Sequence, residues 1–307
     1  MNKITFSQAI DGYLLFANAR RLSHHTIRDY VTTFRKFQDF LDEDPPIEEI
    51  TSKQVESFLA AQTVSKKTLL NYHTGLSALW TWCVNDKITT EHIVRKVKRA
   101  KPEKRDIKPY SQVEVKAMLS ALNHSKPYKR PGKRECTHKL SQVERTKAIL
   151  YLLLDTGIRA SELSNLKIHH VNMRNRTVTV MGKGSKERMI PYSARTGQIL
   201  WRYLAQREND SAGDYLFVTI QGRQLSRTRL LRMLVALGER ADVPGVNVHR
   251  FRHTFAVNYL RNEGDPYSLQ IMLGHSTMEM VKTYLNIAQA DLQKNHLKAS
   301  PIENWRL

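Results

Sequence analysis

The residues whose chemistry suggests a reaction lie in one stretch, between His249 and Tyr284. His249 and Arg252 are three residues apart, so on a helix their side chains leave the same face. His275 follows farther along the chain, and Tyr284 follows that histidine. Cations and imidazoles grouped in this way favour an anion as ligand. A phenol beside them suits phosphate chemistry in which the tyrosine oxygen is the nucleophile.

Two helices must position these side chains. The first carries His249 and is expected to end before Gly264-Asp265-Pro266, where the glycine and the proline break the helical pattern. Ser276 and Glu279 form a capping-box pattern, which predicts that a new helix begins at Ser276 and carries Tyr284.

A second cation precedes this stretch. The run from Ile149 to Leu154 is apolar on all sides, which predicts a buried helix, and a glycine turn at Gly157 ends it. Arg159 and Glu162 follow at helical spacing. A pair of this kind is ordinarily a surface ion pair worth under ~1 kcal/mol. Here the buried helix and the glycine turn are expected to hold the arginine at a fixed, partly enclosed position.

A third cation lies at the tip of a predicted hairpin. Residues 177–180 and 188–191 read as short strands, and the turn between them contains Gly182, Lys183 and Gly184. A lysine at such a tip is able to enter a groove and deliver its ammonium group to a phosphate or to a leaving oxygen. An exposed turn lysine is the alternative.

Length and charge limit the class of protein. The chain has 307 residues, more than one domain usually holds, so two domains are expected. Its hydrophobic content of 41% is enough for buried cores, and its net charge of +20 favours a polyanionic partner, most commonly nucleic acid. Ribosomal proteins and heparin binders share this charge. The chain starts without a signal-peptide core, no apolar run is long enough for a bilayer, and the two cysteines lie in unrelated contexts, which predicts a cytoplasmic protein.

The first hundred residues predict a bundle of four helices. Each apolar run at helical spacing follows a residue suited to cap a helix: Thr5, Ser23, Thr51 and Ser65. The aromatic stripe along these helices indicates a core rather than a base-stacking surface. Polar positions between the stripes are candidates for phosphate contacts, although solvated charge explains any one of them equally well: Arg20, Arg21, Lys66 and Lys67.

A basic stretch, residues 95–108, separates this helical region from the rest of the chain. Its composition predicts a linker, which either lies along a phosphate backbone or is solvated. The expected domains are therefore 1–94 and 109–287, followed by a tail at 288–307.

The second domain is predicted to mix helices with a few short strands, one of them at Asp214–Val218. A basic amphipathic helix from about Ser226 presents Arg227 and Arg229, and such a face suits a DNA groove, though solvation is the plainer interpretation of any one charge. Residues 124–139 are basic and without periodicity, which indicates a loop. Their irregularly spaced cysteine and histidines are weak support for a metal, and no metal site is predicted.

The order of these motifs resembles the tyrosine recombinase family, which includes phage integrases and Xer-type recombinases. The resemblance rests on T-G-I-R-A-S-E-L, M-G-K-G-S-K-E-R, H-R-F-R-H and L-G-H-S, followed by a tyrosine on the next helix. It covers the chain from about Pro109 to Ile287. It implies a mainly α fold with a small β-sheet, in which a helical, SAM-like core-binding domain precedes a mixed α/β catalytic domain.

The resemblance also implies the site. Two arginines would stabilise the extra negative charge of a pentacoordinate phosphate transition state. An acidic residue behind the first arginine would orient its neighbours, and no metal, nucleotide or other cofactor is needed. The implied catalytic positions are Arg159, Lys183, His249, Arg252, His275 and Tyr284, with Glu162 as the acidic residue.

Individual roles follow from the residue types. Tyr284 has an ordinary pKa near ~10, so it must lose its proton during attack. His249 is the candidate base or proton shuttle, because imidazole titrates near neutrality. Lys183 is expected to protonate the leaving 5′ oxygen, and His275 to donate a hydrogen bond to a phosphate oxygen.

The implied function is site-specific DNA recombination through a 3′-phosphotyrosyl intermediate and a Holliday junction. It would serve either integration and excision of a mobile element or Xer-type resolution. The implied DNA partner is a duplex with inverted-repeat core sites. Three further protomers, identical or from a related recombinase, would complete a tetramer on two such sites. The implied location is the nucleoid, with no membrane partner. The tail either docks on a neighbouring protomer or packs on its own domain.

Two other functions use some of the same features. A type IB topoisomerase would use the same residues for strand passage, but the compact two-domain layout argues against it. A catalytically silent, architectural DNA-binding protein would keep the basic charge alone, and the intact set of site residues argues against that.

Overall fold

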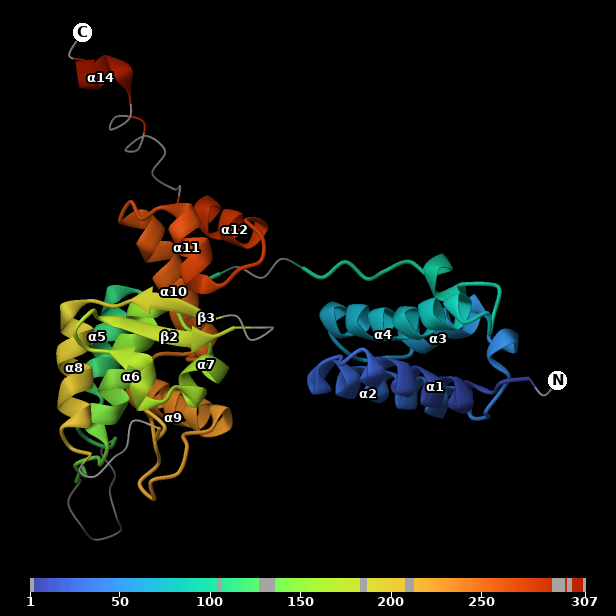
Figure 1. Cartoon of the computed structure of the whole chain (residues 1–307), viewed down its shortest axis with the longest axis horizontal. Helices are drawn as coiled ribbons and strands as arrows, with labels where there is room; N and C mark the ends of the chain where they lie inside the picture. Colours follow the sequence, from blue (N-terminus) through green and yellow to red (C-terminus); the bar gives the residue numbers. More distant parts are fainter. Residues whose placement is uncertain are drawn as a thin grey trace. The chain divides into compact units, whose positions relative to one another are not determined.

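The computed structural model describes residues 3–103, 107–126, 136–182, 187–207, 213–288, 296 and 300–305. Contacts divide the chain into two units, Met1–Asp106 and Ile107–Leu307 (Figure 1). The boundary lies inside the predicted linker. The start of that linker is packed, because Val97 is buried in the core of the first unit together with Val94. None of the described helices is both long enough and apolar enough to cross a membrane.

The first unit is a bundle of helices. The predicted caps are present, since the side chains of all four cap residues accept a backbone hydrogen bond from the first helical turn. These bonds satisfy amide groups that a helix start leaves unpaired. The helices are α1 (Phe6–Ala19), α2 (His24–Leu41), η1 (Ile47–Glu49), α3 (Ser52–Ala60), α4 (Lys66–Asn85) and η2 (Ile93–Lys96).

Aromatic side chains fill the core of this unit. Phe6 and Phe37 meet edge to face, with ring centroids 5.4 Å apart, and Phe37 packs on Phe58 in the same manner at 5.1 Å. All three rings are fully buried, as is Trp80. The aromatic stripe of the sequence is therefore core and not a base-stacking surface.

The second unit combines helices with one small sheet. Its three strands are antiparallel in the order β1-β2-β3, and Val180 of β2 lies opposite Arg188 of β3. The predicted fold class, mainly α with a small sheet, is confirmed. The elements are α5 (Gln112–Ser120), α6 (Val143–Thr156), α7 (Ala160–Asn165), η3 (Ile168–His170), β1 (Val171–Asn172), β2 (Thr177–Met181), β3 (Glu187–Pro191), α8 (Ala194–Leu204), α9 (Arg227–Arg240), α10 (Val248–Arg261), α11 (Pro266–Leu273), α12 (Glu279–Ala288) and α14 (Pro301–Trp305).

Two local predictions differ from the structure. The helix that carries the tyrosine, α12, begins at Glu279 and not at Ser276. The chain is still tied to α11 just before it, because the His275 amide donates to the Gln270 carbonyl at 3.1 Å. The predicted strand at Asp214–Val218 forms only isolated bridges, with residues that are themselves outside strands.

Helix α10 is central to the second unit. It packs on both α6 and α12, and α11 lies beside α12 (Figure 1). The approach of α10 to the end of α6 depends on Gly157, which adopts a left-handed φ of +59°. A Cβ atom at this position would lie 2.5 Å from Cδ1 of Phe255 on α10. Only glycine fits both the backbone and the contact.

Gly157→Ala is expected to destabilise the second unit by roughly 2–5 kcal/mol, as the sum of left-handed strain and overpacking. Gly222→Ala is the matched control, because Gly222 also has a positive φ of +72° but nothing within 4 Å of the added atom. That substitution is expected to cost only about 1–2 kcal/mol, the strain alone. Urea unfolding of both variants measures the difference, and equal losses would contradict the packing of α10 on Gly157.

Candidate active site

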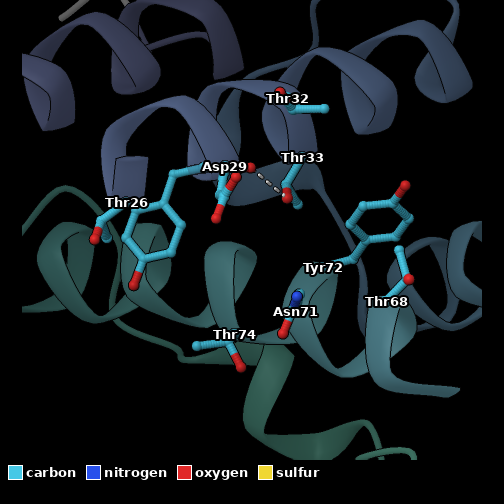
Figure 2. A pocket seen from close by; sticks show the side chains of 9 residues that line it. Thr26, Asp29, Thr32, Thr33, Thr68, Asn71, Tyr72 and Thr74 are labelled. Atoms are coloured by element: carbon cyan, nitrogen blue, oxygen red, sulfur yellow. Dashed lines mark hydrogen bonds between the residues drawn. The ribbon is translucent and has the colours of Figure 1, made fainter. Parts of the chain in front are cut away.

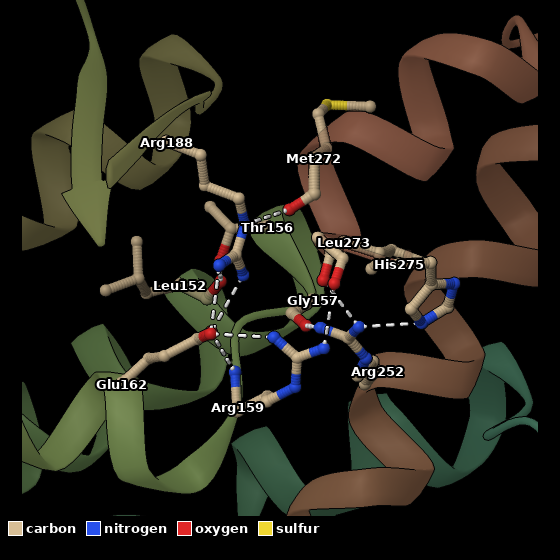
Figure 3. Close-up of polar contacts among 11 residues, drawn as sticks. Leu152, Thr156, Gly157, Arg159, Glu162, Arg188, Arg252, Met272, Leu273 and His275 are labelled. Atoms are coloured by element: carbon tan, nitrogen blue, oxygen red, sulfur yellow. Dashed lines mark hydrogen bonds and ion pairs between the residues drawn. The ribbon is translucent and has the colours of Figure 1, made fainter. Parts of the chain in front are cut away.

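A buried carboxylate lies at the centre of the site. Glu162 on α7 is 7% exposed and accepts four hydrogen bonds from two arginines (Figure 3). The backbone N and the Nη1 atom of Arg159 each donate at 2.8 Å, and Nη1 and Nη2 of Arg188 each donate at 2.9 Å. Burial opposes ionisation, yet the pKa of Glu162 is lowered, because these donors favour the charged form. One negative charge therefore fixes two guanidinium groups.

Arg188 is not among the residues that the motifs predict for the site. It lies on the same face of β3 as the buried Ile190, with its side chain 10% exposed. Its Nε atom also donates to the carbonyl oxygen of Met272 at 2.8 Å, which ties the sheet to α11. Alternate residues of a strand share a face. An arginine at an inward position of the predicted strand is thus the signal that could have identified it.

Arg252 is held by carbonyl groups at the ends of two helices. It is 5% exposed on α10, and it donates to the Gly157 oxygen at 2.8 Å and to the Leu273 oxygen at 2.7 Å. These carbonyls belong to the negative ends of α6 and α11. Burial lowers the pKa of Arg252 to about 10, with a further contribution from the positive charge of Arg159. No carboxylate among the described residues pairs with Arg252, so its charge is available to an anion.

Arg159 connects the start of α7 to the end of α11. Its Nη2 atom donates to the Gly274 oxygen at 3.1 Å, and its side chain is 36% exposed. Gly274 ends α11 with φ +63°, and a Cβ atom there would lie 3.1 Å from the guanidinium carbon of Arg188. A cavity of about 640 Å³ opens beside these groups. Its lining includes Arg159, Arg188, Gly274, His275 and Ser276.

His275 carries a buried hydrogen-bond donor that has no partner among the described residues. Its Nε2 atom lies 2.8 Å from Nη2 of Arg252 and must accept there, because a guanidinium has no acceptor. The proton of the neutral ring is therefore on Nδ1, which is buried and finds no partner among the described residues. Burial and the charges of Arg252 and Arg159 lower the pKa of His275 to about 4. The ring is neutral near neutral pH and offers one unpaired N–H.

His249 lies one helical turn before Arg252 on α10. Its pKa is lowered by burial and then by the charges of Arg252, Arg227 and Arg159. The ring makes no hydrogen bond to any residue that the structure describes. It is thus a neutral imidazole at the edge of the arginine cluster.

Tyr284 on α12 is 2% exposed and lies within this group of residues. Its ring stacks on that of His275 with an interplanar angle of 12°, and its hydroxyl lies 2.9 Å from Nδ1 of His253. Burial raises the pKa of Tyr284, and the charges of Arg252 and Arg159 oppose that increase. Six of the seven expected residues are thus close enough to contact or to influence one another. Lys183, the seventh, lies outside the described residues.

The cations expected to contact DNA are mostly exposed. Arg20 covers the Phe16 ring at 5.3 Å, and Lys66 pairs with Glu103 at 2.6 Å, an exposed pair that contributes little stability. Two further candidates of the first unit are exposed: Arg21 and Lys67. In the second unit Arg227 and Arg229 are also exposed, and Arg227 is near enough to His249 to lower the pKa of that ring.

A polar groove of about 370 Å³ lies between α2 and α4 of the first unit (Figure 2). Hydroxyl groups, one amide and the carboxylate of Asp29 line it, so it offers both donors and acceptors of hydrogen bonds. The lining side chains are Thr26, Asp29, Tyr30, Thr32, Thr33, Thr68, Asn71, Tyr72 and Thr74. A surface of this kind suits contacts to the edges of bases.

Known recombinases and integrases are similar to this chain over most of its length. The tyrosine recombinase XerC of Staphylococcus epidermidis is 28% identical over 290 residues, which cover 92% of this chain and 93% of that protein. The tyrosine recombinase XerD of Pseudomonas aeruginosa is 29% identical over 245 residues, 78% of each chain. The Tn1549 transposon integrase, solved in complex with a circular intermediate DNA, has the same fold, with a TM-score of 0.74 at 17% identity over 95% of this chain and 99% of that one.

Two family models match the chain. The model of the N-terminal SAM-like domain of phage integrases matches residues 10–90, within the first unit. The model of the phage integrase family matches residues 134–291, more than half of the chain and all of the site described above. The chain therefore belongs to the phage integrase family, and it is a tyrosine recombinase.

Proposed function

We propose that this chain carries out site-specific DNA recombination in which Tyr284 attacks a phosphodiester and becomes linked to the 3′ phosphate. One observation carries the proposal: the buried tyrosine lies in the same site as two guanidinium groups and an unpaired imidazole N–H, and Arg159 and His275 of this site line an open cavity. That the Tn1549 integrase was solved with DNA supports DNA as the substrate.

The arginines suit the phosphate group in both charge and shape. A guanidinium presents a planar fork of donors that matches two phosphate oxygens. Arg159 and Arg252 would hold the non-bridging oxygens and stabilise the charge that develops on them during attack. Because Glu162 and the helix-end carbonyls already fix both side chains, little reorganisation is needed when DNA binds.

The remaining roles complete the reaction. His275 would donate its Nδ1–H to a phosphate oxygen, and Lys183 would protonate the leaving 5′ oxygen. His249, expected from the sequence as a base or as a proton shuttle, would serve as the shuttle, because the described hydrogen bond of the Tyr284 hydroxyl goes to another ring. The phosphotyrosyl bond stores the energy of the broken bond, so attack by the 5′ hydroxyl of another strand rejoins the DNA without a cofactor.

Recombination also requires an assembly. We propose that four protomers, identical or shared with a related recombinase, act on two DNA sites with inverted-repeat core sequences and form a Holliday junction. The first unit would contact each core site through its exposed cations and through the groove between α2 and α4. Its polar lining supports base contacts, and the cations support phosphate contacts.

The nucleophile is tested by selecting nicked duplexes with randomised sequence flanking the nick for detergent-resistant attachment to the protein. Wild type is expected to enrich a sequence with inverted repeats and to form the adduct. Tyr284→Phe should form none while it still binds the enriched duplex, because only the hydroxyl is lost. Binding of the enriched DNA by both proteins without any adduct would favour an architectural role. Relaxation of supercoiled DNA without strand exchange would favour a topoisomerase.

Arg188→Met is expected to lower the free energy of unfolding by about 3–5 kcal/mol, because it removes one partner of a buried carboxylate. It should also slow adduct formation, since Arg159 alone then holds Glu162. Met189→Ala, at the neighbouring position that is 68% exposed, is the control and should change neither property. Denaturant unfolding and adduct kinetics measure the two effects. An Arg188→Met protein as stable and as fast as wild type would show that the carboxylate does not depend on this arginine.

The affinity of Tyr284→Phe for its enriched duplex is expected to fall steeply as salt rises, because binding releases counterions from the phosphates. Adding Lys67→Ala or Arg227→Ala should each reduce the slope of log K against log salt by about 0.9. Lys3→Ala is the control, since Lys3 pairs with Glu49 of η1, which follows the C-terminal end of α2. A slope that neither substitution changes would remove these cations from the DNA interface.

A further inference from the structure

His253 contacts the reacting atom, although no motif assigned it a role. It follows Arg252 on α10, and its Nδ1 atom lies 2.9 Å from the Tyr284 hydroxyl oxygen. The two rings are 5.6 Å apart between centroids. Tyr284 belongs to a cluster of buried apolar residues from α10, α11 and α12, including Val257, Leu269 and Val281. Within the described part of the chain, His253 is the side chain that hydrogen-bonds this hydroxyl.

The hydrogen bond has a definite direction. Burial raises the pKa of Tyr284, so the phenol keeps its proton in the resting protein. Burial lowers the pKa of His253, and repulsion from His249 in its protonated form and from Arg252 lowers it further, so the ring is neutral near neutral pH. A phenol is a strong donor and a neutral imidazole has one acceptor nitrogen. The proton of the tyrosine therefore points at the Nδ1 lone pair.

The other two imidazoles of the site are less suited to accept this proton. The Nε2 lone pair of His275 is occupied by Arg252, and its Nδ1 atom already carries a proton. The His249 ring makes no hydrogen bond to Tyr284 or to any other described residue, and the charges of three arginines disfavour its protonation. The hydrogen bond to the Tyr284 hydroxyl thus identifies the His253 ring as the one placed to accept the proton.

We propose that His253 is the base that accepts the Tyr284 proton when the tyrosine attacks DNA. The bond from the Tyr284 oxygen to phosphorus forms and the bond from phosphorus to the 5′ oxygen breaks. The phenolic proton moves to Nδ1 of His253, and the ring becomes an imidazolium that keeps its Nε2 proton. The 5′ oxygen takes its proton from a separate group, for which Lys183 is the proposed donor. Rejoining reverses each transfer.

The surroundings of His253 suit a reversible transfer. His249 and Arg252 face it from its own helix, and the charge of Arg159 reaches the same site from the start of α7. From the α11–α12 turn and from α12 it faces the neutral rings of His275 and Tyr284. The groups near the ring are therefore cationic or neutral. An imidazolium in this environment returns its proton readily, as rejoining requires.

The inference rests on the proposed function, and adduct formation on the enriched nicked duplex tests both. The pKa of His253 is lowered from the ordinary histidine value of 6.5, so the wild-type rate should fall at a pH below that value. The reason is that a protonated His253 cannot accept the tyrosine proton. His253→Asn places an oxygen acceptor near the position of Nδ1 without a titrating group. It should slow the reaction by about 100-fold or more and abolish this decrease at low pH. His253→Gln, whose acceptor matches Nε2 instead, should be slower still, and His249→Asn should keep the decrease at low pH.

A duplex with sulfur in place of the bridging 5′ oxygen distinguishes the proton acceptor of the reaction from its proton donor. A thiolate leaves without protonation, so Lys183→Ala should recover on this duplex and His253→Asn should not. The base assignment is wrong if His253→Asn cleaves with the wild-type rate and pH profile, or if sulfur restores it. If the wild-type protein forms no adduct at all, the proposed function itself fails. Unchanged thermal unfolding of His253→Asn will show that any loss is not a loss of folding.

Discussion

The site depends on a single buried negative charge. Glu162 receives donors from Arg159 and Arg188, and those two arginines in turn bond to carbonyl oxygens in and just after α11. One carboxylate thereby connects α7, β3 and α11. Burying it would be unfavourable without these four hydrogen bonds, so the arginines and the acid require one another. The outcome is a set of guanidinium groups that are in position before any phosphate arrives.

Helix ends provide the second constraint. Gly157 and Gly274 terminate α6 and α11 in left-handed conformations, and each gives its carbonyl oxygen to an arginine of the site. A Cβ atom added at Gly157 would clash with the Phe255 ring, and one added at Gly274 would press on the Arg188 guanidinium. Backbone conformation, core packing and charge placement thus coincide at two glycines. This explains why a cluster of like charges is tolerated in the interior: helix-end dipoles offset part of the repulsion.

The tyrosine occupies an environment in which opposing effects meet. Burial keeps its proton in place, while the neighbouring arginines favour the phenolate. Its hydroxyl is neither exposed nor unpaired, since His253 binds it. A nucleophile held in this way is protected from water and still lies next to a proton acceptor. The same contacts that keep Tyr284 unreactive in the free protein therefore provide a path for its proton during attack.

Much of the architecture could be predicted from the sequence because the signals are local. Helix caps such as Ser23 and the aromatic core around Phe37 follow from spacing and composition. Six of the residues that the motifs predict for the site lie together in the structure. Arg188 and His253 were missed because their partners are distant along the chain, 26 residues for Glu162 and 31 for Tyr284.

Local pattern failed for similar reasons at two other places. The helix start predicted at Ser276 is displaced because the preceding residue remains bonded to α11. Asp214–Val218 has the composition of a strand, but Tyr215 and Val218 pair only as isolated bridges. In each case a contact made by the folded chain overrides the local preference.

The central claim is that preorganised guanidinium groups neutralise one phosphate beside Tyr284. The most direct measurement compares Arg159→Ala with wild type on two versions of the enriched nicked duplex, one carrying an ordinary scissile phosphate and one an uncharged methylphosphonate. Arg188 still pairs with Glu162 in this variant, so the fold should persist. We expect Arg159→Ala to form almost no adduct on the phosphate and to recover on the methylphosphonate, where there is less charge to neutralise. An equal defect on both duplexes would contradict the account.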